Sequence, residues 1–74
     1  MTRLPVVSGK RTVRALEKLG WQVHRRESSH VSMKKDGHSA LLTVPDHHEL
    51  APGTLRRLIR DAGITVEQFV DALR

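Results

Sequence analysis

The segment HVSMKKDGHSALLTV, residues 30–44, constrains the fold more strongly than any other part of this chain. Apolar and polar residues alternate on both sides of Asp36-Gly37, and an Asp-Gly pair between two alternating runs is typical of a two-residue hairpin turn. A turn at this position sets the pairing of two antiparallel strands. The predicted pairs are Lys35 with His38, Met33 with Ala40, and Val31 with Leu42.

This pairing gives the predicted sheet two different faces. One face is apolar and holds Val31, Met33, Ala40, Leu42 and Val44. The other face is largely polar and holds His30, Ser32, Lys34, Ser39, Leu41 and Thr43. Once the turn is placed, the alternation before it and the alternation after it assign the same two faces independently. This agreement supports the predicted register of the two strands. An apolar sheet face has to be covered, so helices are expected on one side of the sheet.

The residues before the hairpin predict a helix and a further strand. Ser8 is suited to cap a helix over residues 9–19, in which valine and leucine recur at helical spacing. The stretch WQVHRR, residues 21–26, then alternates like a strand. Trp21 and Val23 share one face, which makes Trp21 a core residue rather than a platform for stacking bases. The opposite face of this strand holds Gln22, His24 and Arg26.

The residues after the hairpin predict two more helices. Pro45 ends the third strand, and a helix over residues 53–63 stops at Gly63. Thr65 and Gln68 form a capping-box pattern at the start of a short last helix. The inner stripe of the longer helix is Leu55, Leu58, Ile59 and Ala62. The expected fold is therefore α+β, a three-stranded antiparallel sheet with helices packed on one face, and residues 1–74 form a single domain.

Length and charge limit the possible functions. The chain has 74 residues and no cysteine, which excludes disulfides and thiolate metal sites. It has no segment of membrane-spanning length or signal-peptide character, so we expect a soluble, cytoplasmic protein. Residues 1–38 hold nine Lys/Arg against three acids, a net +6, whereas the remainder has a net −1. Such a basic half is typical of a polyanion binder, although a solvated basic face has the same composition.

One stretch resembles a known family closely. VPDHHELAPGTLRRLIRDAGIT, residues 44–65, resembles the P-x-H-x-E-L-x-x-G-T-L-R segment of the HicA toxins, also called YcfA-like proteins. Upstream, ALEKLGWQVHRR is similar to their first helix and strand. Ser28-Ser29-His30 stands where they carry Gly-Ser-His, and Val31 follows where many members carry a second histidine. The resemblance covers about residues 8 to 72.

The resemblance implies a fold, an activity and a partner. HicA proteins are small toxins of toxin–antitoxin pairs, with a fold similar to a double-stranded-RNA-binding domain (dsRBD). They cleave messenger RNA with a histidine at the start of the second strand, which corresponds to His30 in this chain. Their partner, the HicB antitoxin, binds the toxin and masks its active surface. On this basis the free chain is expected to be a monomeric, metal-independent endoribonuclease that requires no cofactor.

The residue types around His30 suit that chemistry. Histidine can move the protons of RNA cleavage because its ordinary pKa of about 6.5 lies near physiological pH. Cations stabilise the charge that develops at phosphorus, and hydroxyl groups can orient the phosphate. The expected RNA- or phosphate-binding residues are Arg25, Arg26, Ser29, Ser32, Lys34 and Lys35. His24 and His47, the latter at the P-x-H position, are secondary candidates, and the register places no acid on the face of His30.

Three other interpretations compete with the ribonuclease. The fold and charge equally suit an RNA-binding module without catalysis. Residues 55–73 have the outline of a helix-turn-helix, but Glu67 and Asp71 on the second helix would repel DNA phosphates. His47-His48 with His38 suggest a metal site, yet no cysteine or acidic cluster completes a ligand set.

Overall fold

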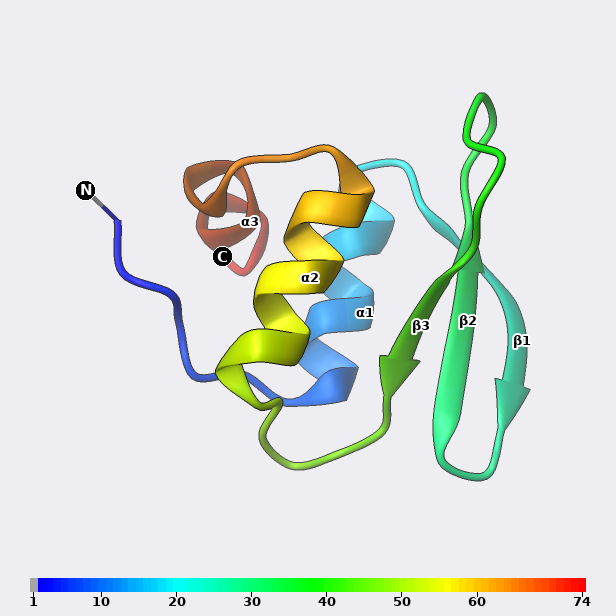
Figure 1. Ribbon diagram of the computed structural model, residues 1–74, viewed down its shortest axis with the longest axis horizontal. Coiled ribbons are helices and arrows are strands. Elements are labelled where there is room, and N and C mark those ends of the chain that lie inside the picture. Colours follow the sequence, from blue (N-terminus) through cyan, green and yellow to red (C-terminus); the bar gives the residue numbers. More distant parts are fainter. Residues whose placement is uncertain (1) are drawn as a thin grey trace.

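The computed structural model describes residues 2–74 and has the predicted order of elements. The elements are α1 (Gly9–Lys18), β1 (Gln22–Glu27), β2 (His30–Lys34), β3 (Leu42–Pro45), α2 (Pro52–Ala62) and α3 (Val66–Ala72). The strands form one antiparallel sheet in the order β1-β2-β3, so β1 and β3 are its edges. The three helices lie on one side of this sheet (Figure 1). The predicted α+β class and one-sided packing are confirmed.

The helix ends form where the sequence predicts them. The Ser8 hydroxyl accepts a hydrogen bond from the Arg11 amide at 3.1 Å and caps α1. Gly63 ends α2 in the left-handed conformation, with φ of 72°. Thr65 and Gln68 exchange hydrogen bonds of 3.0 and 2.8 Å, which complete the capping box of α3. These local interactions determine where each helix starts or stops.

The core lies between the helices and the apolar face of the sheet. The sheet contributes Val31, Met33, Leu42 and Val44, all buried. The predicted stripe of α2 and Leu16 of α1 cover them, and Phe69 of α3, which packs against α1, is buried in the same core. Trp21 is 1% exposed and belongs to this core, as predicted.

The predicted register between β2 and β3 is wrong by two residues. Val31 pairs with Val44 and Met33 with Leu42, and Ala40 lies in an exposed loop instead of the sheet. A turn does form at Asp36-Gly37, where the His38 amide donates to the Lys35 carbonyl at 3.1 Å. The pair of β2 and β3 nearest this turn is Met33 with Leu42, so residues 35–41 form a connection longer than the predicted two-residue loop. A type I′ turn does not form at Asp36-Gly37, because it needs a positive φ at both residues and only Gly37 has one.

The predicted alternation along β1 is also wrong, because the strand contains a β-bulge. Val23 pairs with Met33 but Arg25 pairs with Ser32, which leaves His24 as an extra residue. Beyond the bulge the alternation is inverted. Arg25 and Glu27 therefore lie on the side of the sheet that the helices leave uncovered, and Arg26 lies on the helix side.

We call the uncovered side the open face. Its residues in the three strands are Gln22, Arg25, Glu27, His30, Ser32, Lys34, Thr43 and Pro45. The expectation that no acid lies on the face of His30 is wrong, because the bulge brings Glu27 onto it.

Candidate active site

His30 is the first residue of β2 and follows a two-residue hairpin loop. Glu27 and His30 are Cα partners, so Ser28 and Ser29 alone connect β1 to β2. Neither serine has a positive φ, so serine fits at position 28 without backbone strain. The Asp46 amide donates to the Ser29 carbonyl at 2.9 Å and ties this loop to the end of β3. The backbone around His30 is thus held on two sides.

The imidazole of His30 is exposed and has a hydroxyl partner on one nitrogen. Ser29 Oγ lies 3.0 Å from His30 Nδ1. A serine hydroxyl can donate to a bare Nδ1 or accept from a protonated one, so the contact suits either charge state of the ring. Nε2 has no hydrogen bond to residues 2–74 and is the nitrogen left for a ligand.

Several predicted site residues share the open face with His30. Ser32 follows on the same side of β2 and lies opposite Arg25, whose carbonyl accepts a hydrogen bond from the Ser32 hydroxyl at 3.4 Å. Lys34 is the next residue on this side of β2. The open face therefore combines a histidine, an arginine, a lysine and a hydroxyl along two neighbouring strands.

Glu27 is the residue of this site that the sequence interpretation missed. Its carboxylate lies 3.8 Å from the Arg25 guanidinium, and both side chains are about two-thirds exposed. An ion pair as exposed as this contributes only about 0–1 kcal/mol, because water screens it. An incoming phosphate can therefore displace the Glu27 carboxylate from the Arg25 guanidinium at a small cost in free energy. The length of the Ser28-Ser29 loop was the sequence signal that could have placed Glu27 opposite His30.

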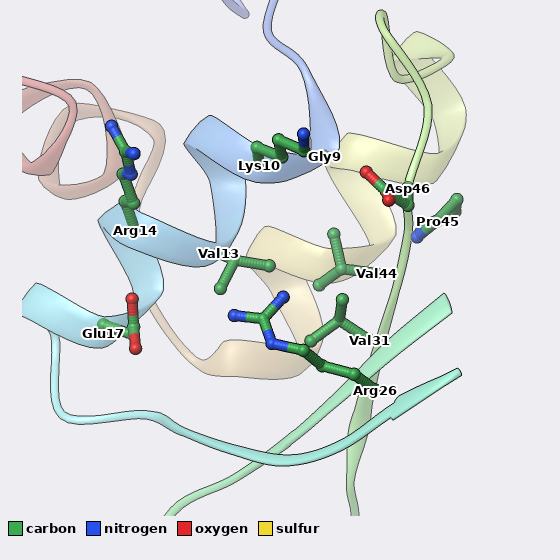
Figure 2. A pocket seen from close by; sticks show the side chains of 10 residues that line it. All are labelled: Gly9, Lys10, Val13, Arg14, Glu17, Arg26, Val31, Val44, Pro45 and Asp46. Carbon is green, nitrogen blue, oxygen red and sulfur yellow. The ribbon is translucent and has the colours of Figure 1, made fainter. Parts of the chain in front are cut away.

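Two predicted phosphate ligands lie elsewhere. Lys35 Nζ donates to the Leu19 carbonyl at 3.0 Å and is half-buried at the end of α1. Arg26 lies on the helix side of β1, where Figure 2 shows its guanidinium beside Val31 and extending toward Val13 of α1. Of the predicted cations, only Arg25 and Lys34 share a face with His30.

The secondary histidines are also separated from His30. His24 is the bulged residue of β1, between the pairs formed by Val23 and Arg25, and lies further along the strand than the Glu27–His30 pair. The imidazole of His47 is exposed, and its carbonyl accepts the Gly9 amide at 2.9 Å. His38 packs against Trp21, with ring centroids 4.9 Å apart. Among residues 2–74, no three His, Cys, Asp or Glu side chains are grouped so as to hold a metal ion.

A groove runs between α1 and the helix side of β1. We call it the α1–β1 groove; its floor is apolar, formed by Val13, Val31 and Val44. Three cations line it, Lys10, Arg14 and Arg26, together with Glu17 and Asp46 (Figure 2). It does not contain His30, which lies on the opposite face of the sheet.

Comparison with known proteins adds one finding to this geometry. The sequence model of one protein family, the HicA toxin of bacterial toxin–antitoxin systems, matches residues 9–64. The matched region runs from the start of α1 to two residues past the end of α2 and includes the whole sheet. No curated protein matches the chain. None of the helices that residues 2–74 form has the length and apolar character needed to span a bilayer.

Proposed function

The chain belongs to the HicA family of toxins from bacterial toxin–antitoxin systems, and on that premise we propose that it is a metal-independent endoribonuclease that cleaves messenger RNA with His30. As a toxin of this family it has a cognate antitoxin, which we propose is of the HicB type and covers the open face. The position of His30 at the start of β2, with a free Nε2 and a hydroxyl partner on Nδ1, carries the proposal.

The reaction needs a base for the 2′-hydroxyl, an acid for the 5′-oxygen and positive charge near the phosphorus. The 2′-oxygen of a ribose attacks the neighbouring phosphorus, the bond to the 5′-oxygen breaks, and a 2′,3′-cyclic phosphate and a 5′-hydroxyl result. When the ring is neutral, His30 Nε2 takes the proton of the 2′-hydroxyl and water protonates the 5′-oxygen; when the ring is charged, His30 gives its proton to the 5′-oxygen and water accepts that of the 2′-hydroxyl. Ser29 supports Nδ1 in either state, and so keeps Nε2 directed away from the hairpin loop.

The cations of the open face supply the electrostatic part of catalysis. Arg25 and Lys34 lie on the same side of the sheet as His30, and we assign them to the scissile phosphate and its neighbour. A guanidinium offers two parallel N–H groups to a phosphate, and an ammonium adds a mobile charge. Charge that develops at phosphorus is stabilised most effectively by donors that are already in place. Ser32 contributes a hydroxyl between these two cations.

The test is cleavage of a labelled RNA in EDTA by the protein and by His30→Ala. We expect cleavage by the protein and a loss of at least about a hundredfold in His30→Ala, because general acid–base catalysis contributes roughly 10²–10⁴ in rate. His48→Ala is the matched control, since it removes an exposed histidine outside the open face and should cleave normally. Undiminished cleavage by His30→Ala would refute the role of His30.

An RNA-binding module without cleavage is the second candidate. One observation favours it: Val31, where many HicA toxins carry a second histidine, is 6% exposed and packed in the core. The position after His30 therefore offers no second imidazole to RNA. The same experiment separates the two functions, because binding of intact RNA in EDTA without products would support this module.

A further inference from the structure

Two consecutive arginines of β1 lie on opposite sides of the sheet. Arg25 pairs with Ser32 on the open face, whereas Arg26 pairs with the buried Val31 on the helix side. The strand that carries them is an edge of the sheet, so no other strand covers its outer side. A flexible ligand held by Arg25 can therefore pass over this edge and reach Arg26.

The α1–β1 groove is suited to an anion at the point where such a ligand would arrive. The Arg26 guanidinium extends from β1 toward Val13 of α1, and Lys10 and Arg14 of α1 also line the groove, with their charged ends directed away from Arg26 (Figure 2). None of these three cations takes part in the ion pairs that residues 2–74 form, which join Arg25 to Glu27 and Arg60 to Asp61. The guanidinium therefore keeps its full capacity for an anionic partner.

We propose that the α1–β1 groove binds a backbone phosphate of RNA and that the RNA strand crosses the free edge of β1 between this groove and His30. The inference rests on the proposed function, because it extends the substrate path of the same site. Arg26 is the central ligand, since its side chain is exposed and its planar fork can hold two phosphate oxygens. Lys10 and Arg14, which also line the groove, add positive charge at longer range.

The charge of the groove agrees with a phosphate and limits how many it holds. Its three cations outnumber its two carboxylates, Glu17 and Asp46, by one. The carboxylates lie on either side of the guanidinium, toward opposite ends of the groove (Figure 2). A single phosphate at Arg26 fits this arrangement, whereas further phosphates along the groove would meet Glu17 or Asp46. The groove is therefore a subsite for one phosphate beside the scissile one.

The experiment measures binding of a short single-stranded RNA at several salt concentrations, in a His30→Ala background that cannot cleave it. Arg26→Gln should weaken binding about tenfold at low salt, the loss expected for a charge-assisted hydrogen bond. It should also reduce the slope of log K against log salt by about 0.7, the value for one phosphate contact on a single strand. Arg60→Gln is the control, because it removes one exposed positive charge on α2.

Lys10→Gln is the second variant and should weaken binding in the same direction, which guards against a folding defect specific to Arg26→Gln. Equal RNA affinities of Arg26→Gln and Arg60→Gln would refute the proposed phosphate site in the groove. So would a loss of antitoxin binding in Arg26→Gln with RNA binding intact, since the groove would then serve a protein partner. RNA affinity is measured here without cleavage. A loss of affinity in Arg26→Gln therefore supports the phosphate site in the groove even if the wild-type chain does not cleave RNA. An inactive wild-type chain would refute only the proposed catalysis.

Discussion

Glu27 lies directly opposite His30 across the β1–β2 hairpin, on the same open face. A carboxylate thus stands beside the histidine at the point where an RNA phosphate is expected. Directly opposed residues of antiparallel strands have Cβ atoms about 4.5–5.5 Å apart, close enough for their charges to matter. The Glu27 carboxylate also forms an ion pair with the Arg25 guanidinium, at 3.8 Å. The negative charge beside His30 and the ion pair with Arg25 both lower the affinity of the open face for an anion.

Glu27→Gln should therefore bind RNA more tightly than the unmodified chain. The change removes a negative charge beside the phosphate and frees Arg25, and for exposed groups each effect amounts to about 0.2–1 kcal/mol. Together they amount to about 0.4–2 kcal/mol, so we expect affinity to rise about two- to thirtyfold at low salt and the gain to shrink as salt screens the charges. Titration of RNA against Glu27→Gln in a His30→Ala background measures this. Glu67→Gln, on α3, is the control with the same charge change.

Ser29→Ala should lower the rate of cleavage and leave RNA affinity nearly unchanged. The variant removes the 3.0 Å partner of His30 Nδ1, so the ring is no longer held in one orientation. A lost hydrogen bond of about 0.5–1.5 kcal/mol corresponds to a fall in kcat of about two- to tenfold. Ser28→Ala is the matched control in the same loop. A rise in KM with unchanged kcat in Ser29→Ala would assign Ser29 to RNA binding instead.

Ser28→Gly should leave cleavage unchanged, although it restores the residue that HicA toxins usually carry here. Ser28 has no positive φ, so glycine relieves no backbone strain. Glycine only adds freedom to the unfolded chain, at a cost to stability of about 0.4–1 kcal/mol. Urea denaturation measures the expected loss of stability, and the cleavage rate of the variant tests whether activity is unchanged. A large gain in cleavage would mean that the loop works in a conformation that serine resists.

Gly9→Ala should destabilise the protein strongly. A Cβ at this position would overlap the Pro45 carbonyl oxygen, because the start of α1 lies against the end of β3. Backbone would have to move, at a cost of about 1–3 kcal/mol or more. Gly53→Ala is the contrast: its Cβ would meet nothing within 4 Å, and alanine favours the helix by about 1 kcal/mol. Thermal unfolding of the two variants should shift in opposite directions.

Much of this fold could be predicted because its signals are local. Caps at Ser8 and Thr65, the stop at Gly63 and the alternation of β2 depend on neighbouring residues, and all are confirmed. The strand register is not local. A slip of two residues between β2 and β3 keeps every side chain on its face, so the apolar pattern fits the predicted and the observed pairing equally well.

The site was predictable to the same extent. The alternation of β2 placed His30, Ser32 and Lys34 on one face, and the structure has them there. An extra residue in β1 leaves no mark in a pattern of polar side chains, since His24, Arg25 and Arg26 are all polar. The bulge therefore places Arg25, and not Arg26, on the face of His30, and it adds Glu27 to that face. The alternation of side chains alone could not predict either change.

The bulge at His24 also affects how copies of this protein meet one another. An exposed edge strand offers unpaired amides and carbonyls to any other strand, and irregular or charged edges discourage such pairing. β1 has a bulge and two arginines at its edge, while β3 has only four residues and ends at Pro45, which lacks an amide hydrogen. Both edges thus oppose strand addition between identical chains. The chain is protected from edge-to-edge aggregation by the same irregularity that sends Arg25 and Arg26 to opposite faces.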